Sequence, residues 1–207
     1  MEIYQTEEEQ VDAIKAWWDQ NGKSIIVGLV IVLGSVFGWN KWSEHQQALS
    51  ESASSRYQMM VTQMDSDIDG AVAMGRSLKQ EFKESHYSVL AAMMIAKIEV
   101  GRNQLEMAEA ELSWAAEQSS NPIFVDLANS RRARVILAQG RSDDALAMLS
   151  KVSNQSFSGV VAEIKGDAYI SQGERDKARS AYQQALVGYA DMPEKRSQIQ
   201  TKLDDLN

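Results

Sequence analysis

The sequence contains no cysteine, only two prolines and only two histidines in 207 residues. Without cysteine there is no disulfide, no thiolate-bound zinc and no thiol chemistry. His45 and His86 each stand alone, so a histidine metal site is not expected. Proline interrupts helices, and its scarcity, together with the lack of sustained strand-like alternation, predicts an all-α protein.

Motifs that mark common active sites are also missing. There is no glycine-rich phosphate loop, no nucleophile elbow and no HExxH segment. Glu106, Glu109 and Glu111 follow helix-surface spacing, which is typical of a solvated face rather than an acid–base pair. We therefore predict a non-catalytic protein without cofactor or metal. Acidic side chains outnumber basic ones by 29 to 21, which argues against nucleic acid as a partner.

What the sequence does have is a long uncharged run, SIIVGLVIVLGSVFGW, over residues 24–39. With Asn40 it spans about 25 Å as a helix, just short of the ~30 Å bilayer core. Flanking lysines can extend this length by snorkelling, and tryptophans at both ends are typical of a membrane interface. These features predict a transmembrane helix over residues 23–42. The predicted interface anchors are Trp17, Trp18, Lys23, Trp39, Lys41 and Trp42.

Other interpretations of this run are weaker. A buried core helix is rarely bracketed by tryptophan and lysine, and a cleavable signal peptide begins with a basic segment, whereas this chain begins with an acidic one. The spacing of Gly34 and Gly38 leaves a helix-dimerising face open as a possibility. Lysine and arginine are tied across the run, with Lys15 and Lys23 before it and Lys41 and Arg56 after it. The charge rule therefore assigns no orientation.

Residues 1–22 form an acidic tail. Thr6 and Glu9 have the spacing of a capping box, and apolar residues between Val11 and Trp18 recur at helical spacing. This predicts a short amphipathic helix near the interface, ended by Asn21-Gly22. The tail is either a docking or degradation handle or a solvated flank of the anchor.

An internal repeat lies within residues 43–207, which form the predicted domain after the membrane helix. Three rows share offsets of seven, five, four and three residues and begin 37 and then 33 residues apart. Small residues permit close helix approach, and the Asn or Gly supplies a positive φ where a first helix ends. The rows are Ala96, Asn103, Ala108, Leu112, Ala115; Ala133, Gly140, Ala145, Leu149, Val152; and Gly166, Gly173, Ala178, Tyr182, Ala185.

This pattern is similar to the tetratricopeptide repeat, whose period is about 34 residues. Only the third row has the aromatic residue usual in the first helix, Tyr169, where the others have Glu99 and Ile136. We predict an α-solenoid of helix hairpins rather than an unrelated bundle. Its expected parts are an atypical hairpin at 44–64 and 70–84, repeats near 89–122, 126–158 and 159–192, and a capping helix at 193–206.

The repeat phase also predicts which residues face the concave side. Lys97, Arg134 and Asp167 occupy the same position on successive first helices, and Arg131, Arg132 and Arg134 form the one basic cluster. Such a lining suits a segment of another protein better than an inert face. The candidate protein-binding groove consists of Met93, Lys97, Val100, Leu127, Ser130, Arg134, Leu137, Asp167 and Ile170.

The chain resembles one family, the ancillary subunit of the bacterial SecYEG translocon (YfgM type). The similarity lies in the opening segment up to Trp39, in YSVLAAMMIAK, and in the stretches around LANSRRARVILAQG and KGDAYISQGERDKA. It implies a single-pass protein of the bacterial inner membrane, with a cytoplasmic amino terminus and a periplasmic repeat domain. It also implies association with SecYEG and with a membrane-anchored periplasmic chaperone of prolyl-isomerase type, and a role in passing on newly exported client proteins.

The leading hypothesis is therefore a membrane-tethered adaptor or chaperone at the exit of the translocon. The alternative is a structural scaffold for another envelope assembly, such as pilus or division machinery. An enzyme would need a pocket with perturbed titratable groups, which the sequence does not indicate.

Overall fold

The computed structural model describes residues 7–206, with side chains from residue 9 onward, and every regular element in this range is helical. The described chain forms two compact units, one up to Glu51 and one from Ser52 onward. An all-α fold is confirmed. The helices are α1 (Glu7–Gln63), α2 (Ile68–Glu81), α3 (His86–Gly101), α4 (Leu105–Gln118), α5 (Pro122–Ala138), α6 (Ser142–Leu149), the 3-10 turn η1 (Gln155–Phe157), α7 (Ser158–Ser171), α8 (Arg175–Gly188) and α9 (Pro193–Asp204).

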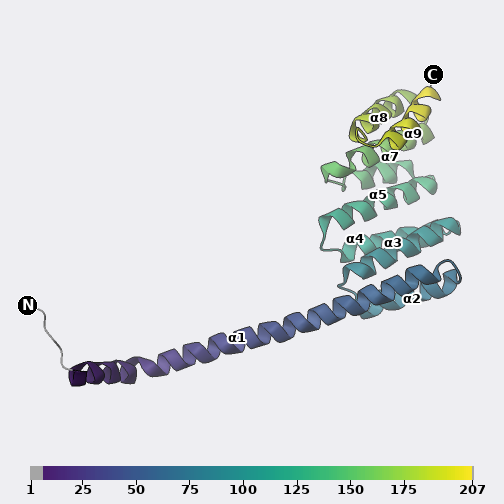
Figure 1. Ribbon diagram of the computed structural model, residues 1–207. Helices are drawn as coiled ribbons and strands as arrows, with labels where there is room; N and C mark the ends of the chain where they lie inside the picture. Colours follow the sequence, from purple (N-terminus) through teal and green to yellow (C-terminus); the bar gives the residue numbers. More distant parts are fainter. Residues whose placement is uncertain (1–6, 207) are drawn as a thin grey trace, which may run out of the picture. The chain divides into compact units, whose positions relative to one another are not determined.

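The first unit is the greater part of α1, a continuous helix (Figure 1). The predicted helix end at Asn21-Gly22 is wrong. Asn21 Nδ2 donates to the Trp17 carbonyl at 2.9 Å, and Gly22 lies buried beneath the Trp18 ring, so both residues support the helix instead of ending it. The capping box predicted at Thr6 lies outside the described residues.

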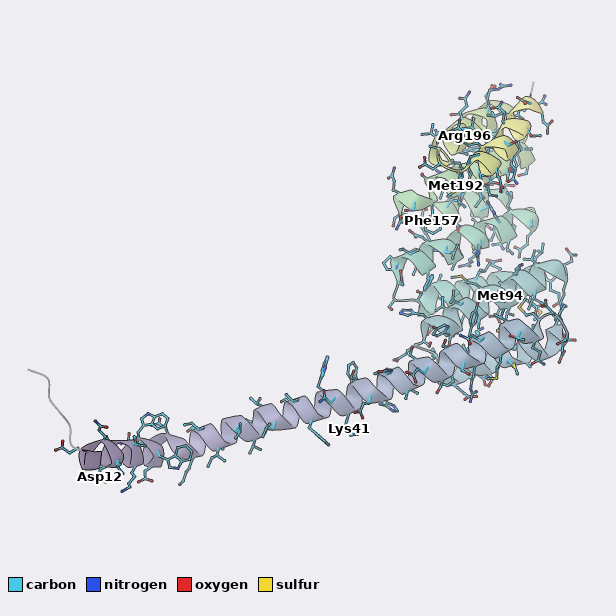
Figure 2. All side chains as sticks on the ribbon, viewed as in Figure 1. Asp12, Lys41, Met94, Phe157, Met192 and Arg196 are labelled. Atoms are coloured by element: carbon cyan, nitrogen blue, oxygen red, sulfur yellow. The ribbon has the colours of Figure 1, made fainter. Side chains whose placement is uncertain are left out.

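Among the described helices, α1 is the one long and apolar enough to cross a membrane. Its apolar side chains are exposed on all sides, as Val30 and Phe37 illustrate. The hydroxyl of Ser35 donates to the Ile31 carbonyl at 2.7 Å, which satisfies that polar group within the helix itself. Trp39 and Trp42 pack together with ring centroids 5.2 Å apart. Lys41, labelled in Figure 2, pairs with Glu44.

The second unit is a stack of helix hairpins in chain order, α3/α4, α5/α6 and α7/α8, followed by α9 (Figure 1). Before them, the end of α1 packs with α2 and α3 through a core that includes Met60, Leu78 and Ile95. After them, Ile199 and Leu203 of α9, with Leu206 just beyond its end, join the core of the last hairpin. Each hairpin therefore shares its core with the elements that come before or after it in the chain.

The turns inside the three hairpins have one conformation. Among the described residues, only Asn103, Gly140 and Gly173 have positive φ, at 59°, 78° and 76°. The amide one residue further on bonds back to the first helix in each case: Gln104 to Glu99 at 2.8 Å, Arg141 to Ile136 at 3.2 Å, and Glu174 to Tyr169 at 2.9 Å. This is the Schellman arrangement, which satisfies the last carbonyls of a helix. The predicted positive φ at these positions is confirmed.

The small repeat positions are buried where the helices of a hairpin cross. Ala96, Ala133 and Gly166 pack inward on the first helices, and a Cβ on Gly166 would lie only 2.3 Å from the Tyr182 ring. The larger Tyr182 is 3% exposed and fills the space that this glycine leaves. Steric matching, as predicted, sets these positions.

The second hairpin departs from the pattern because α6 ends at Leu149. Val152, the last residue of the second repeat row, lies in the segment that follows this helix. The buried carboxylate of Asp126 accepts hydrogen bonds from the amides of Ser153 at 3.2 Å and Asn154 at 2.8 Å. These bonds fix the chain in a turn that leads into η1, so α6 stays short.

Candidate functional site

A groove of about 640 Å³ lies between α3 and α5, the first helices of two successive hairpins. The end of α1 contributes Tyr57 to it, and α4 contributes Leu105 and Leu112. We call this feature the α3–α5 groove. Its lining residues are Tyr57, Leu90, Met93, Met94, Ala96, Lys97, Val100, Leu105, Leu112, Leu127, Arg131, Arg134, Val135 and Ala138.

Five of the nine predicted groove residues line the α3–α5 groove. They are Met93, Lys97, Val100, Leu127 and Arg134. Lys97 and Val100 are exposed, whereas Met93 is nearly covered at 3% exposure. A partner segment lying in the groove would therefore meet both apolar and basic side chains.

The other four predicted residues lie elsewhere. Ser130 is buried, and its hydroxyl donates to the Leu127 carbonyl at 2.9 Å. Leu137 packs against the core of the second hairpin, and Ile170 borders a separate hollow beside Gly173 and Tyr182. Asp167 is held by Lys202, with Nζ to Oδ1 at 2.7 Å. Asp167 is thus paired with a side chain of α9, the helix that follows the last repeat.

Sequence reasoning missed other residues of the groove. Leu90 and Met94 lie seven and three residues before Lys97, so they share its helix face; Met94 is labelled in Figure 2. The signal was therefore present in the helical spacing. Tyr57 had no comparable signal because it belongs to the helix that precedes the repeats. The sequence indicates Arg131 only as a member of a basic cluster.

The groove is positively charged. Lys97, Arg131 and Arg134 line it, and none of the described aspartates or glutamates does so. The Arg131 guanidinium lies over α3, with Nη1 3.7 Å from the Met93 sulfur. Burial lowers the pKa of Arg131, and the nearby charge of Arg134 acts in the same direction. Arginine nonetheless stays protonated at neutral pH.

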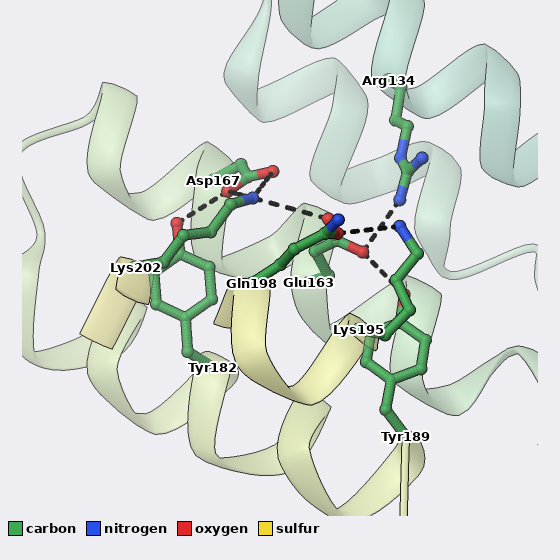
Figure 3. A network of polar contacts seen from close by, with 8 residues as sticks. All are labelled: Arg134, Glu163, Asp167, Tyr182, Tyr189, Lys195, Gln198 and Lys202. Carbon is green, nitrogen blue, oxygen red and sulfur yellow. Dashed lines mark hydrogen bonds and ion pairs between the residues drawn. The ribbon is translucent and has the colours of Figure 1, made fainter. Parts of the chain in front are cut away.

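Arg134 also belongs to a network of polar contacts that joins α5, α7, α8 and α9, with Tyr182 as the member from α8 (Figure 3). At its centre the buried Glu163 accepts hydrogen bonds from Arg134 at 3.0 Å and from the Tyr189 hydroxyl at 2.6 Å. Lys202 reaches both Glu163, at 3.5 Å, and Asp167. This network fastens α9 to α7.

The charges of this network set the pKa of Glu163. Burial raises the pKa, but the Tyr189 hydrogen bond and the positive charges of Arg134 and Lys202 outweigh it, so the pKa lies below its ordinary value. Burial and the Glu163 carboxylate raise the pKa of Tyr189, which therefore remains a hydrogen-bond donor. The protonation states of both groups are therefore stable, which suits a structural contact between helices rather than a site of proton transfer.

The stacked hairpins, their repeat spacing, the three equivalent turns and the α3–α5 groove define an α-solenoid of the tetratricopeptide type. The tetratricopeptide repeat-like domain family matches residues 15–207. The chain is 31% identical over 207 residues to the ancillary SecYEG translocon subunit of Escherichia coli (strain K12), with 100% of both chains covered. It is 32% identical over 200 residues to the protein of the same name from Aggregatibacter actinomycetemcomitans, with 97% of each chain covered.

The chain belongs to the family of ancillary SecYEG translocon subunits. Among solved structures, a thermophilic TPR protein of Thermus thermophilus matches with a TM-score of 0.54 at 21% identity. The match covers 76% of this chain and 86% of that one. At this identity the likeness concerns the fold alone, and it agrees with the helix hairpins described above.

Proposed function

We propose that this protein is a non-catalytic, membrane-tethered adaptor that associates with the SecYEG translocon and binds segments of newly exported proteins in its α3–α5 groove. The observation that carries the proposal is that one chain has both an apolar helix of membrane length and a repeat domain with the α3–α5 groove. Its relatives are named as translocon subunits. Tetratricopeptide-type domains use their grooves to hold polypeptide, which fits such a role.

In the proposed arrangement, residues 23–42 cross the inner membrane, residues 1–22 lie in the cytoplasm and residues 43–207 lie in the periplasm. The tether keeps the groove at high local concentration beside the channel, so weak contacts with an emerging chain are sufficient. A membrane-anchored periplasmic chaperone of prolyl-isomerase type is the second proposed partner. The adaptor would pass clients towards that chaperone.

Purification from membranes in mild detergent tests the association. The wild-type protein is expected to retain SecY, SecE and SecG, and the matched control carries an unrelated transmembrane helix in place of residues 23–42. If neither protein retains any translocon subunit, the proposed association is wrong. If both retain them equally, the repeat domain rather than the span makes the contact.

A client-holding assay separates the adaptor from the alternative, a structural scaffold of another envelope assembly. An adaptor with an apolar groove should delay aggregation of an unfolded polypeptide at stoichiometric amounts. The control is the Val100→Asp variant, which places a charge on an exposed apolar residue of the groove lining. A scaffold would have no effect on aggregation in either form.

A further inference from the structure

Arg131 differs from most arginines of the repeat domain in what its guanidinium contacts. Arg132 pairs with Glu109 at 3.0 Å, Arg134 with Glu163 at 3.0 Å and Arg141 with Glu109 at 2.8 Å. Arg131 has no carboxylate partner among the described residues, and its one hydrogen-bond acceptor there is the Met93 sulfur at 3.7 Å. A thioether is a weak acceptor, whereas arginine–carboxylate hydrogen bonds are among the strongest in proteins.

The residues around Arg131 indicate what kind of ligand would supply the missing partner. Arg131 is exposed in a groove lined mostly by aliphatic side chains and methionines, so its guanidinium is accessible to a segment that enters the groove. Lys97, on the facing helix α3, adds a second positive charge that has no acidic neighbour in the described lining. Both are held on a protein whose net charge is −8. A local positive field inside an acidic molecule favours anionic segments at the groove and repels them elsewhere.

We propose that the α3–α5 groove selects an apolar polypeptide segment that carries an aspartate or glutamate side chain, and that Arg131 is the residue that determines this specificity. The apolar residues of the segment would cover Met93, Val100 and Leu127. Its carboxylate would replace the Met93 sulfur as the acceptor for the Arg131 guanidinium, with Lys97 as a second contact. This inference rests on the proposed function, because it names the chemistry of the polypeptide that the groove holds.

The test uses the full-length protein in detergent, immobilised and exposed to a library of random twelve-residue peptides with both ends blocked. Blocked ends remove terminal carboxylates, so any preference for acid belongs to side chains. Peptides retained by the wild type are expected to be enriched in aspartate and glutamate within apolar runs. For individual retained peptides, replacing the acid by its amide should weaken binding about tenfold or more.

The matched variants are Arg131→Gln, Arg131→Lys and Arg175→Gln. Arg175 is exposed on α8 outside the groove, so Arg175→Gln removes the same charge and should retain the wild-type peptide preference. Arg131→Gln should abolish the acid preference, and Arg131→Lys should keep part of it because the charge remains but the planar fork is lost. Circular dichroism at 222 nm checks that each variant is folded.

The outcomes separate this inference from the proposed function. Retention of apolar peptides with no preference for acid, or with a preference unchanged by Arg131→Gln, overturns the specificity but leaves a polypeptide-binding groove. Retention of no peptide at all overturns both. Arg131-dependent binding of detergent-dispersed phosphatidylglycerol in place of acidic peptides would also overturn the inference, because the anion would then be a lipid headgroup.

Discussion

Gly166 and Tyr182 share one space between the helices of the third hairpin. In the other two hairpins the equivalent pairs are Ala96 with Leu112 and Ala133 with Leu149, and all of these residues are buried. The smallest first-helix residue therefore stands opposite the largest second-helix residue. Since protein interiors are close-packed, each pair is constrained by its combined volume.

This matching gives a prediction for the pair. Gly166→Ala should lower the free energy of unfolding by about 1–3 kcal/mol, because the new methyl group overlaps the Tyr182 ring. Adding Tyr182→Leu, which recreates the alanine–leucine pair of the other hairpins, should restore part of that loss, although it removes the hydrogen bond from Tyr182 to Asp167. Urea unfolding followed at 222 nm measures both. Gly101→Ala is the control, since a Cβ there meets open space and should not destabilise the helix.

Glu163 gives a prediction for pH. Its pKa in the folded protein lies below the ordinary 4.5, so its charge stabilises the fold above that range, and the stabilisation is lost as pH falls through the folded pKa. Glu163→Gln should therefore lower the free energy of unfolding by about 1–3 kcal/mol at pH 7, and the difference from wild type should shrink towards about pH 3. Urea unfolding across this pH range is the measurement. A difference that does not change with pH would mean that the Glu163 charge is not what joins α9 to α7, and Glu84→Gln, at an exposed position, serves as the control.

At the scale of helices, α9 closes the end of the stack. Its side chains Ile199 and Leu203, together with Leu206 just beyond its end, cover the core of the last hairpin. Lys202 of the same helix joins the polar network of Glu163 and Asp167. A terminal helix of this kind has one apolar face and one solvated face, which repeat proteins need at their ends. Both kinds of contact thus hold the same short helix.

The apolar contact can be tested by itself. Ile199 is fully buried, and Ile199→Ala should cost about 2–4 kcal/mol of unfolding free energy through lost burial and the cavity left behind. The neighbouring Gln200 is exposed, so Gln200→Ala should change stability by less than about 0.5 kcal/mol. Thermal unfolding by differential scanning calorimetry compares the two. Equal effects at Ile199 and Gln200 would show that α9 does not depend on this packing.

The helices also show which parts of the fold could be predicted from sequence. The hairpins were predictable because Asn103, Gly140 and Gly173 mark backbone turns that few other residues adopt. The early end of α6 was not, because Asp126, which fixes it, lies 27 residues before Ser153. Asn21-Gly22 misled for a similar reason: such a pair often ends a helix, but here contacts with Trp17 and Trp18 keep it helical. Long-range contacts leave no local pattern.

The groove was predicted in part for the same reason. Repeat phase alone placed Lys97 and Arg134 correctly on the first helices, because equivalent positions face the same side. The repeat phase could not show that Lys202 of α9 would pair with Asp167. Nor could it show that the end of α1 would bring Tyr57 to the groove. These contacts depend on elements outside the repeat.

At the scale of the whole molecule, the proposed topology places the repeat domain in the periplasm. The basic residues near the span are tied, so the charge rule gives no answer. We expect a reporter that is active only outside the cytoplasm to be active when fused after Asn207. The same fusion lacking residues 23–42 should be inactive. Activity confined to a cytoplasmic reporter would overturn the proposed location of the groove beside exported chains.

The α3–α5 groove has a further consequence, because its two walls touch each other at few points. Most of the contacts of α5 are instead with α4 and α6, its neighbours along the chain. A segment bound between α3 and α5 would contact both helices and so reduce local opening where they pack against each other only sparsely. The amide hydrogens of α5 should then exchange with deuterium more slowly in the loaded protein than in the empty one, so occupancy of the groove could be followed without labelling the client.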